Sequence, residues 1–138
     1  MPVPDTSILV PLFDADHPHH ARARRAVGAP GPLHVSGGVL AELTTVLRRR
    51  GSDVGLDGEL IAREALERLE ALQGYRHASE YDAVAVSRLY RTHSGLSYVD
   101  AWGIALALGM DEQLLTLDAR QRAVYRRERA REPGQRQR

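Results

Sequence analysis

Residues 114–118 read Leu-Leu-Thr-Leu-Asp and predict a short buried strand that leads straight into a helix. Asp118 begins that predicted helix, because aspartate is a preferred residue at a helix N-terminus. The chain opens on the same pattern, since Pro2-Val3-Pro4 is followed by Asp5 and then by the apolar run from Ile8. In an open parallel sheet, ligands bind outside the carboxyl ends of the strands. The two aspartates could therefore meet at one edge of a sheet.

Further strands and helices are expected between these two ends. Leu33-His34-Val35 and residues 75–78 are short segments that fit buried strands. Apolar residues at three- and four-residue steps, together with capping residues and glycine stops, predict the helices. The helices are expected directly after Asp5, from an Asp16 N-cap to about Gly28, from Ser36 to a stop at Gly51, over 58–72, over 80–91, from Ser97 to Gly109, and from Asp118.

Short strands separated by helices imply a single α/β domain whose parallel sheet is covered on both faces. We expect residues 1–131 to form this domain and residues 132–138 to form a flexible basic tail. Pro2 and Pro4 are unusual in a strand, because proline has no N–H to donate to a neighbouring strand. These prolines leave the pairing of the first strand open.

The composition excludes several kinds of site. The 138 residues include no cysteine, which excludes disulfides, thiolate zinc sites and a thiol nucleophile. All 19 positively charged residues are arginine, so the lysine of a phosphate-binding P-loop and any Schiff-base chemistry are excluded. With 5% aromatic residues, a sheet that stacks RNA bases is not expected.

The charges are unevenly distributed although the formal net charge is +1. The last 20 residues hold eight of the 19 arginines and only two acidic residues, so an acidic body precedes a basic end. This distribution permits contact with nucleic acid without requiring it. No apolar run approaches the roughly 18 residues that a membrane span needs, and the N-terminus does not resemble a signal peptide. We expect a soluble, cytoplasmic protein.

Two more acidic residues occur where apolar residues would be expected. Glu42 shares a helix face with Val39, Leu43 and Val46, where an ionised carboxylate is costly unless it is paired or binds a metal. A position at the edge of the core, paired with arginine or facing solvent, is the simpler alternative. Asp100 follows Ser97 at the spacing of a capping box, which is a structural role on its own. Helix capping alone could likewise explain Asp5 and Asp118.

Convergence of the four carboxylates would explain why they recur at helix starts. Like charges a few ångströms apart raise one another's pKa, and a hard divalent cation with oxygen ligands relieves that repulsion. Such an ion lowers the pKa of a bound water and stabilises the charge that develops on a phosphate. The chemistry that this indicates is metal-assisted hydrolysis of a phosphodiester.

Four segments carry a resemblance to a known family: 5–10 (Asp-Thr-Ser-Ile-Leu-Val), 41–43 (Ala-Glu-Leu), 96–101 (Leu-Ser-Tyr-Val-Asp-Ala) and 115–118 (Leu-Thr-Leu-Asp). In order and spacing the set resembles the PIN-domain nucleases, and in particular the VapC-like toxins of type II toxin–antitoxin systems. The resemblance spans nearly the whole chain. It implies a three-layer α/β/α sandwich with a short central parallel sheet, and a ribonuclease that depends on Mg²⁺ or Mn²⁺.

The resemblance also assigns roles to residues and partners. Asp5 and Asp100 match the acids most regularly assigned as metal ligands, and Glu42 and Asp118 match the other two members of the acidic quartet. Ser7 and Thr116 match small polar positions that support the site. The resemblance further implies an RNA substrate, a homodimer and a separate VapB-like antitoxin. Part of the apolar stripe from Ile61 to Leu72 could face such a partner, although core packing explains most of it.

Other functions remain as alternatives. A binding or regulatory module with the same fold but no catalysis would not need four convergent acids. A haloacid-dehalogenase-like phosphatase needs a second acid where this chain has Ser7, and it needs a lysine, as does a receiver domain. The histidines at 17, 19 and 20 could bind zinc, but exposed histidines at a helix start are commoner. Arginines could hold RNA phosphates, although charge runs are usually solvated; they lie at 22–25, 48–50, 120–122 and 126–131.

Overall fold

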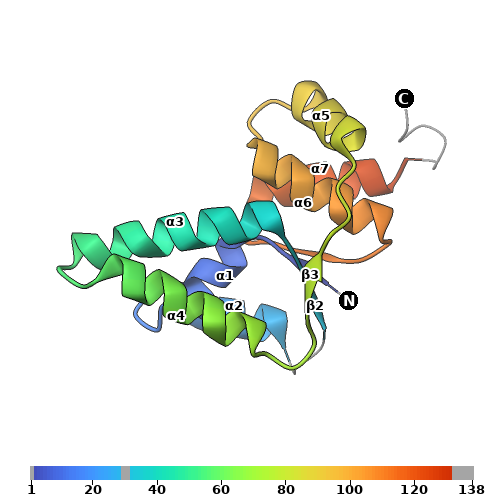
Figure 1. The fold of residues 1–138 in the computed structure, drawn as a ribbon. Helices are drawn as coiled ribbons and strands as arrows, with labels where there is room; N and C mark the ends of the chain where they lie inside the picture. Colours follow the sequence, from blue (N-terminus) through green and yellow to red (C-terminus); the bar gives the residue numbers. More distant parts are fainter. Residues whose placement is uncertain (1, 29–31, 132–138) are drawn as a thin grey trace.

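The computed structural model describes residues 2–28 and 32–131, whose elements alternate as an α/β chain (Figure 1). Within these residues the strands are β1 (Val3–Pro4), β2 (Leu33–Ser36), β3 (Tyr75–Ala78) and β4 (Leu114–Leu115). The helices of the same residues are α1 (Thr6–Leu12), α2 (His20–Val27), α3 (Gly37–Asp53), α4 (Gly58–Glu70), α5 (Ala83–Thr92), α6 (Tyr98–Gly109) and α7 (Ala119–Arg129). The basic tail expected at residues 132–138 lies outside the described residues.

All strand pairing in the described residues is parallel, as the sequence predicts. β1 pairs with β4, with Val3 opposite Leu114, and β2 pairs with β3 along all four residues. Between the two pairs, the backbone N–H of His34 in β2 donates to the carbonyl of Pro2 at 3.0 Å. The strands therefore lie in the order β3–β2–β1–β4, as two hydrogen-bonded pairs side by side.

The prolines of the first strand explain why the sheet divides into two pairs. The N–H groups of Val3 and Asp5 donate to Gln113 and Leu115 beside β4, both at 2.8 Å. Because successive residues of a strand point their N–H groups to opposite sides, Pro2 and Pro4 face β2 with no N–H to donate. The unusual composition thus leaves the β4 side of β1 fully paired and weakens only its β2 side.

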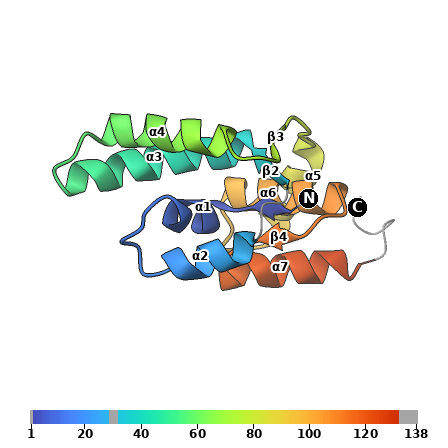
Figure 2. The same cartoon turned by 90° about the horizontal axis from the view of Figure 1, so that it is seen from below.

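Helices cover both faces of the strands. In Figure 2, α3 and α4 lie on one side and α2 and α7 on the other, with the strands between them. One buried cluster joins α1, α3 and α4 around Ile8, Leu43 and Leu69, and a second joins α5, α6 and α7 around Leu89 and Ile104. The predicted α/β/α arrangement with a short parallel sheet is confirmed. No helix of the described residues has the length and apolar character to span a membrane.

The predicted start of the second helix is wrong. Asp16 does not cap a helix; α2 begins at His20, and residues 14–19 form turns. Side chains hold these turns, because Asp14 accepts from the N–H of Asp16 at 3.1 Å and His17 Nδ1 accepts from the N–H of His19 at 3.0 Å. These local hydrogen bonds compete with helix formation and delay its start by one turn.

The predicted stop at Gly51 is also wrong, since α3 continues to Asp53. Gly51 and Gly58 instead let α3 and α4 approach closely where the two helices meet. A Cβ on Gly51 would lie 2.9 Å from the Cα of Gly58, and a Cβ on Gly58 would lie 2.0 Å from the carbonyl oxygen of Arg48. The backbone is too close at this point for any side chain on Gly58.

Gly58→Ala is therefore expected to destabilise the protein by about 2 kcal/mol, because the added methyl group meets fixed backbone rather than a movable side chain. Chemical denaturation followed by circular dichroism measures this loss. Gly109→Ala is the matched control, because no described heavy atom lies within 4 Å of a Cβ built there. Equal stability of the two variants would contradict the close approach.

Candidate metal centre

Asp5 lies at the carboxyl end of β1, where it caps α1. Its side chain is 5% exposed, and it accepts hydrogen bonds from the backbone N–H of Ser7 at 3.2 Å and from the hydroxyl of Thr116 at 3.4 Å. An extended residue before a helix turns its carboxylate back onto the first free N–H groups, which fixes the side chain. The capping role considered for Asp5 is thus real, and it also holds the carboxylate in place beside β4.

Two hydroxyl groups join the ends of β1 and β4. Ser7 Oγ and Thr116 Oγ1 are 3.1 Å apart, Ser7 Oγ accepts from the N–H of Leu117, and Thr116 Oγ1 accepts from the N–H of Asp118. Because the single hydroxyl hydrogen of Thr116 points to Asp5, Ser7 is the donor within the pair. The two residues predicted to support the site therefore lie together and connect Asp5 to the segment that carries Asp118.

Glu42 projects from α3 toward α1. Its Oε1 accepts a hydrogen bond of 2.7 Å from the hydroxyl of Thr6, and its side chain is half-buried. Burial raises the pKa of Glu42 above its ordinary value; the hydrogen bond from Thr6 opposes this, and the charges of Asp5 and Asp100 raise the pKa further. Of the alternative considered for Glu42, an edge position that reaches arginine or solvent, these contacts show no arginine partner, while the side chain is partly exposed to solvent.

Asp100 lies in the first turn of α6. It completes the predicted capping box, since its carboxylate accepts from the N–H of Ser97 and the Ser97 hydroxyl accepts from the N–H of Asp100, both at 3.0 Å. Burial raises the pKa of Asp100, the two hydrogen bonds with Ser97 lower it, and the charges of Asp5 and Asp118 raise it. The net shift is upward, so repulsion and burial outweigh the cap.

The four acids therefore share one electrostatic neighbourhood although they come from four distant segments. Asp118 is exposed and caps α7 through the N–H of Gln121 at 3.0 Å, and its charge acts on Asp100. The charge of Asp5 raises the pKa values of both Glu42 and Asp100. Each carboxylate accepts a hydrogen bond, which is local for Asp5, Asp100 and Asp118. Within residues 2–28 and 32–131, no three acidic or histidine side chains lie close enough together to hold a metal ion.

The donor set suits a hard divalent cation. The side-chain atoms that could bind a cation here are oxygens, which belong to the carboxylates and to the hydroxyls of Ser7 and Thr116. Burial raises the pKa values of two of the carboxylates, Glu42 and Asp100, and the negative charges of the neighbouring acids raise them further. A cation would remove this repulsion, and raised pKa values of clustered carboxylates are typical of functional sites.

Two residues at this site, Thr6 and Gln121, were missed from the sequence, and Arg122, considered there as an RNA contact, has a partner within the protein. Thr6 donates to Glu42, the Arg122 guanidinium donates to the carbonyl of Thr116 at 2.7 Å, and Gln121 is fully buried between Asp100 and Asp118. For Gln121 a signal existed, because it shares a helix face with buried Val124 and Tyr125 at three- and four-residue steps. Nothing in the local sequence distinguishes Thr6 from an ordinary first-turn residue.

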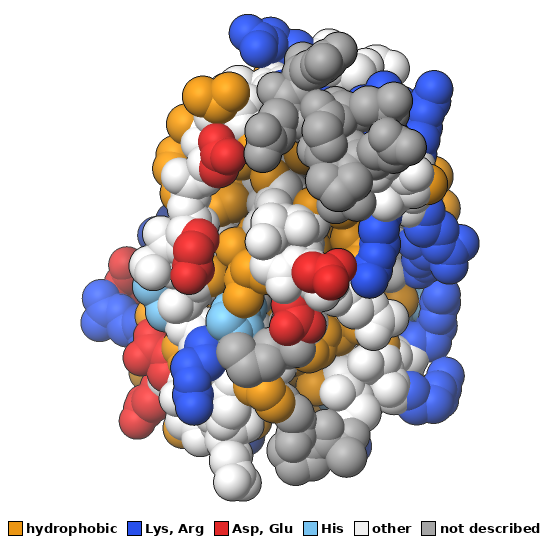
Figure 3. All heavy atoms as spheres, turned by 90° about the vertical axis from the view of Figure 1, so that its right-hand side faces the viewer, with side chains coloured by type: hydrophobic (Ala, Val, Ile, Leu, Met, Phe, Trp, Pro, Cys, Tyr) orange, Lys and Arg blue, Asp and Glu red, His pale blue; other side chains and the backbone are white. Residues whose placement is uncertain are grey.

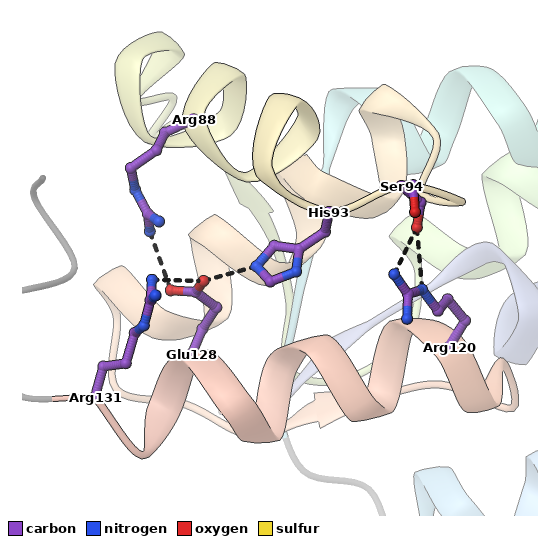
Figure 4. A network of polar contacts seen from close by, with 6 residues as sticks. All are labelled: Arg88, His93, Ser94, Arg120, Glu128 and Arg131. Atoms are coloured by element: carbon purple, nitrogen blue, oxygen red, sulfur yellow. Dashed lines mark hydrogen bonds and ion pairs between the residues drawn. The ribbon is translucent and has the colours of Figure 1, made fainter.

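A second polar network, away from the acids, was also missed (Figure 4). The carboxylate of Glu128 on α7 is completely buried and contacts His93 at 2.7 Å, Arg88 at 3.2 Å and Arg131 at 3.1 Å. Burial raises the pKa of Glu128, but the hydrogen bonds from His93 and Arg88 and the nearby positive charges lower it more, so the net shift is downward. The network ties α7 to α5 and to the loop that follows it.

Several arginines considered as RNA contacts have protein partners. Arg50 forms an ion pair with Asp14 at 2.6 Å, and Arg120 donates to the carbonyl of Ser94, the second contact drawn in Figure 4. On the face shown in Figure 3, most basic side chains lie along the right-hand edge, with others at the top and on the left, while acidic ones lie over the middle and the left-hand side. Trp102 packs against the Tyr81 ring, with ring centroids 4.6 Å apart.

Comparisons with known proteins agree with the fold. The family model of the PIN domain matches residues 3–127. Among solved structures, the crystal structure of VapC20 of Mycobacterium tuberculosis, described as a toxin that cleaves the sarcin-ricin loop, matches with a TM-score of 0.69 and 24% sequence identity. The match covers 89% of this chain and 94% of the toxin, and at this identity it shows a shared fold. No curated protein sequence matches this chain significantly.

Proposed function

This chain belongs to the PIN domain family, and we propose that it is a divalent-cation-dependent endoribonuclease, the toxin of a VapBC-type toxin–antitoxin pair. The observation that carries the proposal is the convergence of acids from four separate segments: hydrogen bonds of Thr116 join Asp5 to Asp118, those of Gln121 join Asp118 to Asp100, and Thr6, next to Asp5, donates to Glu42. Burial raises the pKa values of Glu42 and Asp100, and repulsion by the neighbouring acids raises them further. Repulsion of this kind costs stability, which a purely structural arrangement of acids would avoid.

In this proposal the four carboxylates hold the cation. Asp5 and Asp100 are the central ligands, and Glu42 and Asp118 complete the quartet. Ser7 and Thr116 fix Asp5 and align the two strand ends, while the hydroxyl of Thr6 orients Glu42. The cation, Mg²⁺ or Mn²⁺, supplies Lewis-acid stabilisation of the phosphate and a more acidic water. No lysine occurs in the chain and no histidine is among these contacts, so we assign no separate general base.

We propose the domain boundaries and partners on the same basis. Residues 1–131 form the nuclease domain, and residues 132–138 form a basic tail. The partners are RNA and a VapB-like antitoxin, in the cytoplasm, with a second copy of the chain as a homodimer. Exposed apolar side chains support protein partners: Val54, Leu56 and Leu60 on the α3–α4 hairpin, and Val84 on α5, are all more than half exposed.

The direct test is cleavage of RNA by the purified protein. We expect cleavage of structured RNA in the presence of Mg²⁺ or Mn²⁺, and no cleavage after EDTA treatment until the cation is restored. Sequencing the new RNA ends identifies the target and the bond that is cut. Intact RNA with either cation, together with an unfolding temperature that neither cation changes, would favour the alternative of a PIN-fold binding module without catalysis.

A further inference from the structure

Gln121 is a completely buried polar residue between two of the proposed ligands. Its relative exposure is 0%, and it lies in the first turn of α7 on the face that also buries Val124 and Tyr125. Its side-chain Nε2 donates to the carbonyl oxygen of Asp100 at 3.2 Å, and its backbone N–H donates to the carboxylate of Asp118 at 3.0 Å. One residue thus contacts both Asp100 and Asp118.

Packing alone would favour an apolar side chain at position 121 over the amide of Gln121. Its Oε1 is buried and has no hydrogen-bond partner among the described residues. Gly103 of α6 lies close to the amide, since a Cβ built on Gly103 would lie 3.5 Å from Nε2. An amide that satisfies only part of its hydrogen-bonding capacity inside a core destabilises the fold relative to an apolar side chain of equal size.

The contact with Asp100 also gives Gln121 a means to fix the site. Asp100 lies in the first turn of α6 and Asp118 is the N-cap of α7, and the two helices pack directly on each other. The hydrogen bond from Nε2 joins the first turns of these helices at the level of the acids. The carboxylates repel each other, so a tie between their helices opposes the separation that this repulsion favours.

We propose that Gln121 is a positioning residue that holds Asp100 and Asp118 at the separation at which both can bind one divalent cation. This inference rests on the proposed function, since it concerns the same cation site. Gln121 itself does not bind the cation or the RNA. Its contribution is the hydrogen bond between Nε2 and the carbonyl oxygen of Asp100.

The test is the binding of Mn²⁺ to Gln121→Met, measured by calorimetry on folded protein. Methionine keeps the length of the side chain but cannot donate to the carbonyl of Asp100. Loss of a contact behind a metal ligand typically weakens metal binding, and we expect an increase of about tenfold in the dissociation constant. In cleavage assays, the Mn²⁺ concentration for half-maximal rate should rise by the same factor, while the rate at saturating Mn²⁺ changes little.

Tyr125→Phe is the matched control. It removes two part-buried hydrogen bonds from the same face of α7, since the Tyr125 hydroxyl donates to the carbonyl of Glu112 at 2.8 Å and accepts from the Arg129 guanidinium. This control should bind Mn²⁺ like the wild-type protein. The thermal stability of metal-free Gln121→Met should equal or exceed that of the wild-type protein, because the unpartnered Oε1 is gone.

The outcomes separate the two proposals. Wild-type protein that binds no Mn²⁺ would overturn the proposed function. Wild-type binding together with unchanged binding by Gln121→Met would overturn only the role of Gln121. If Gln121→Met does not fold, Gln121→Asn takes its place, because its shorter amide does not reach the carbonyl. Failure of both variants to fold would overturn the inference too, since Gln121 would then be a structural residue.

Discussion

Asp100→Asn is expected to lose RNA cleavage by about a thousandfold or more, because removing one ligand carboxylate forfeits several kcal/mol of cation-dependent transition-state stabilisation. The same variant is expected to be at least as stable as the wild-type protein when no divalent cation is present. Loss of activity combined with retained or increased stability is the signature of a residue kept for function.

The stability part of this prediction follows from the raised pKa of Asp100. Burial raises this pKa, and the charges of Asp5 and Asp118 add to it. An acid whose pKa is higher in the folded protein destabilises the fold when it is ionised, so the penalty is present at neutral pH and is relieved as the pH falls. Asparagine removes the charge at every pH and still accepts the N–H of Ser97.

Cleavage rates and thermal unfolding with and without Mg²⁺ check this prediction. Asp16→Asn is the matched control, because Asp16 is exposed and lies outside the site. The control should cleave RNA normally and gain the same stability from Mg²⁺ as the wild-type protein, whereas Asp100→Asn should gain much less. Normal cleavage of RNA by Asp100→Asn would contradict the assignment of Asp100 as a ligand of the cation.

Glu128→Gln is expected to reduce the free energy of unfolding by about 3 kcal/mol, because breaking a buried ion pair leaves its partners without compensation. The carboxylate is fully buried and contacts the side chains of Arg88 and His93, which are only 14% and 8% exposed. Without the negative charge these two side chains would have no counter-ion in this network. Urea denaturation measures the loss. Glu59→Gln is the matched control, since Glu59 and Arg63 form an exposed pair at 3.9 Å that should contribute little.

The effect of Glu128 should depend on pH in a defined direction. Burial raises its pKa, but hydrogen bonds from His93 and Arg88 lower it more, so the pKa in the folded protein is below the ordinary value. A lowered pKa means that the stabilisation is complete above the ordinary glutamate pKa and is lost as the pH falls through the lowered value. The difference between wild-type and Glu128→Gln protein should therefore shrink in acid. A difference that grows in acid would contradict this assignment.

The features that could be predicted from the sequence are those with local causes. Asp5, Ser36, Ser97 and Asp118 each cap a helix, as their residue types and positions indicate. Each cap also fixes where a helix starts relative to a strand end. The order of strands and helices followed from these starts, and so did the expectation that the acids lie at one edge of the sheet.

The features that were missed depend on contacts between distant segments. Gly51 resembles a helix stop, but its role is to admit the backbone of Gly58, which no local pattern reveals. The hydrogen-bond partner of Glu42 is Thr6 of another helix, which no local pattern indicates. Gln121 and Glu128 occupy the apolar face of α7, and only the helical period of that segment hinted that they are buried.

The central claim is that four carboxylates together bind a divalent cation, Mg²⁺ or Mn²⁺. These are the carboxylates of Asp5, Glu42, Asp100 and Asp118. Anomalous diffraction from crystals grown with Mn²⁺ locates the ion without any assumption about activity. The account predicts an anomalous peak within about 2.2 Å of carboxylate oxygens of Asp5 and Asp100, with Glu42 and Asp118 facing it directly or through water. A Mn²⁺ peak elsewhere in protein that cleaves RNA, with none between these carboxylates, would contradict it.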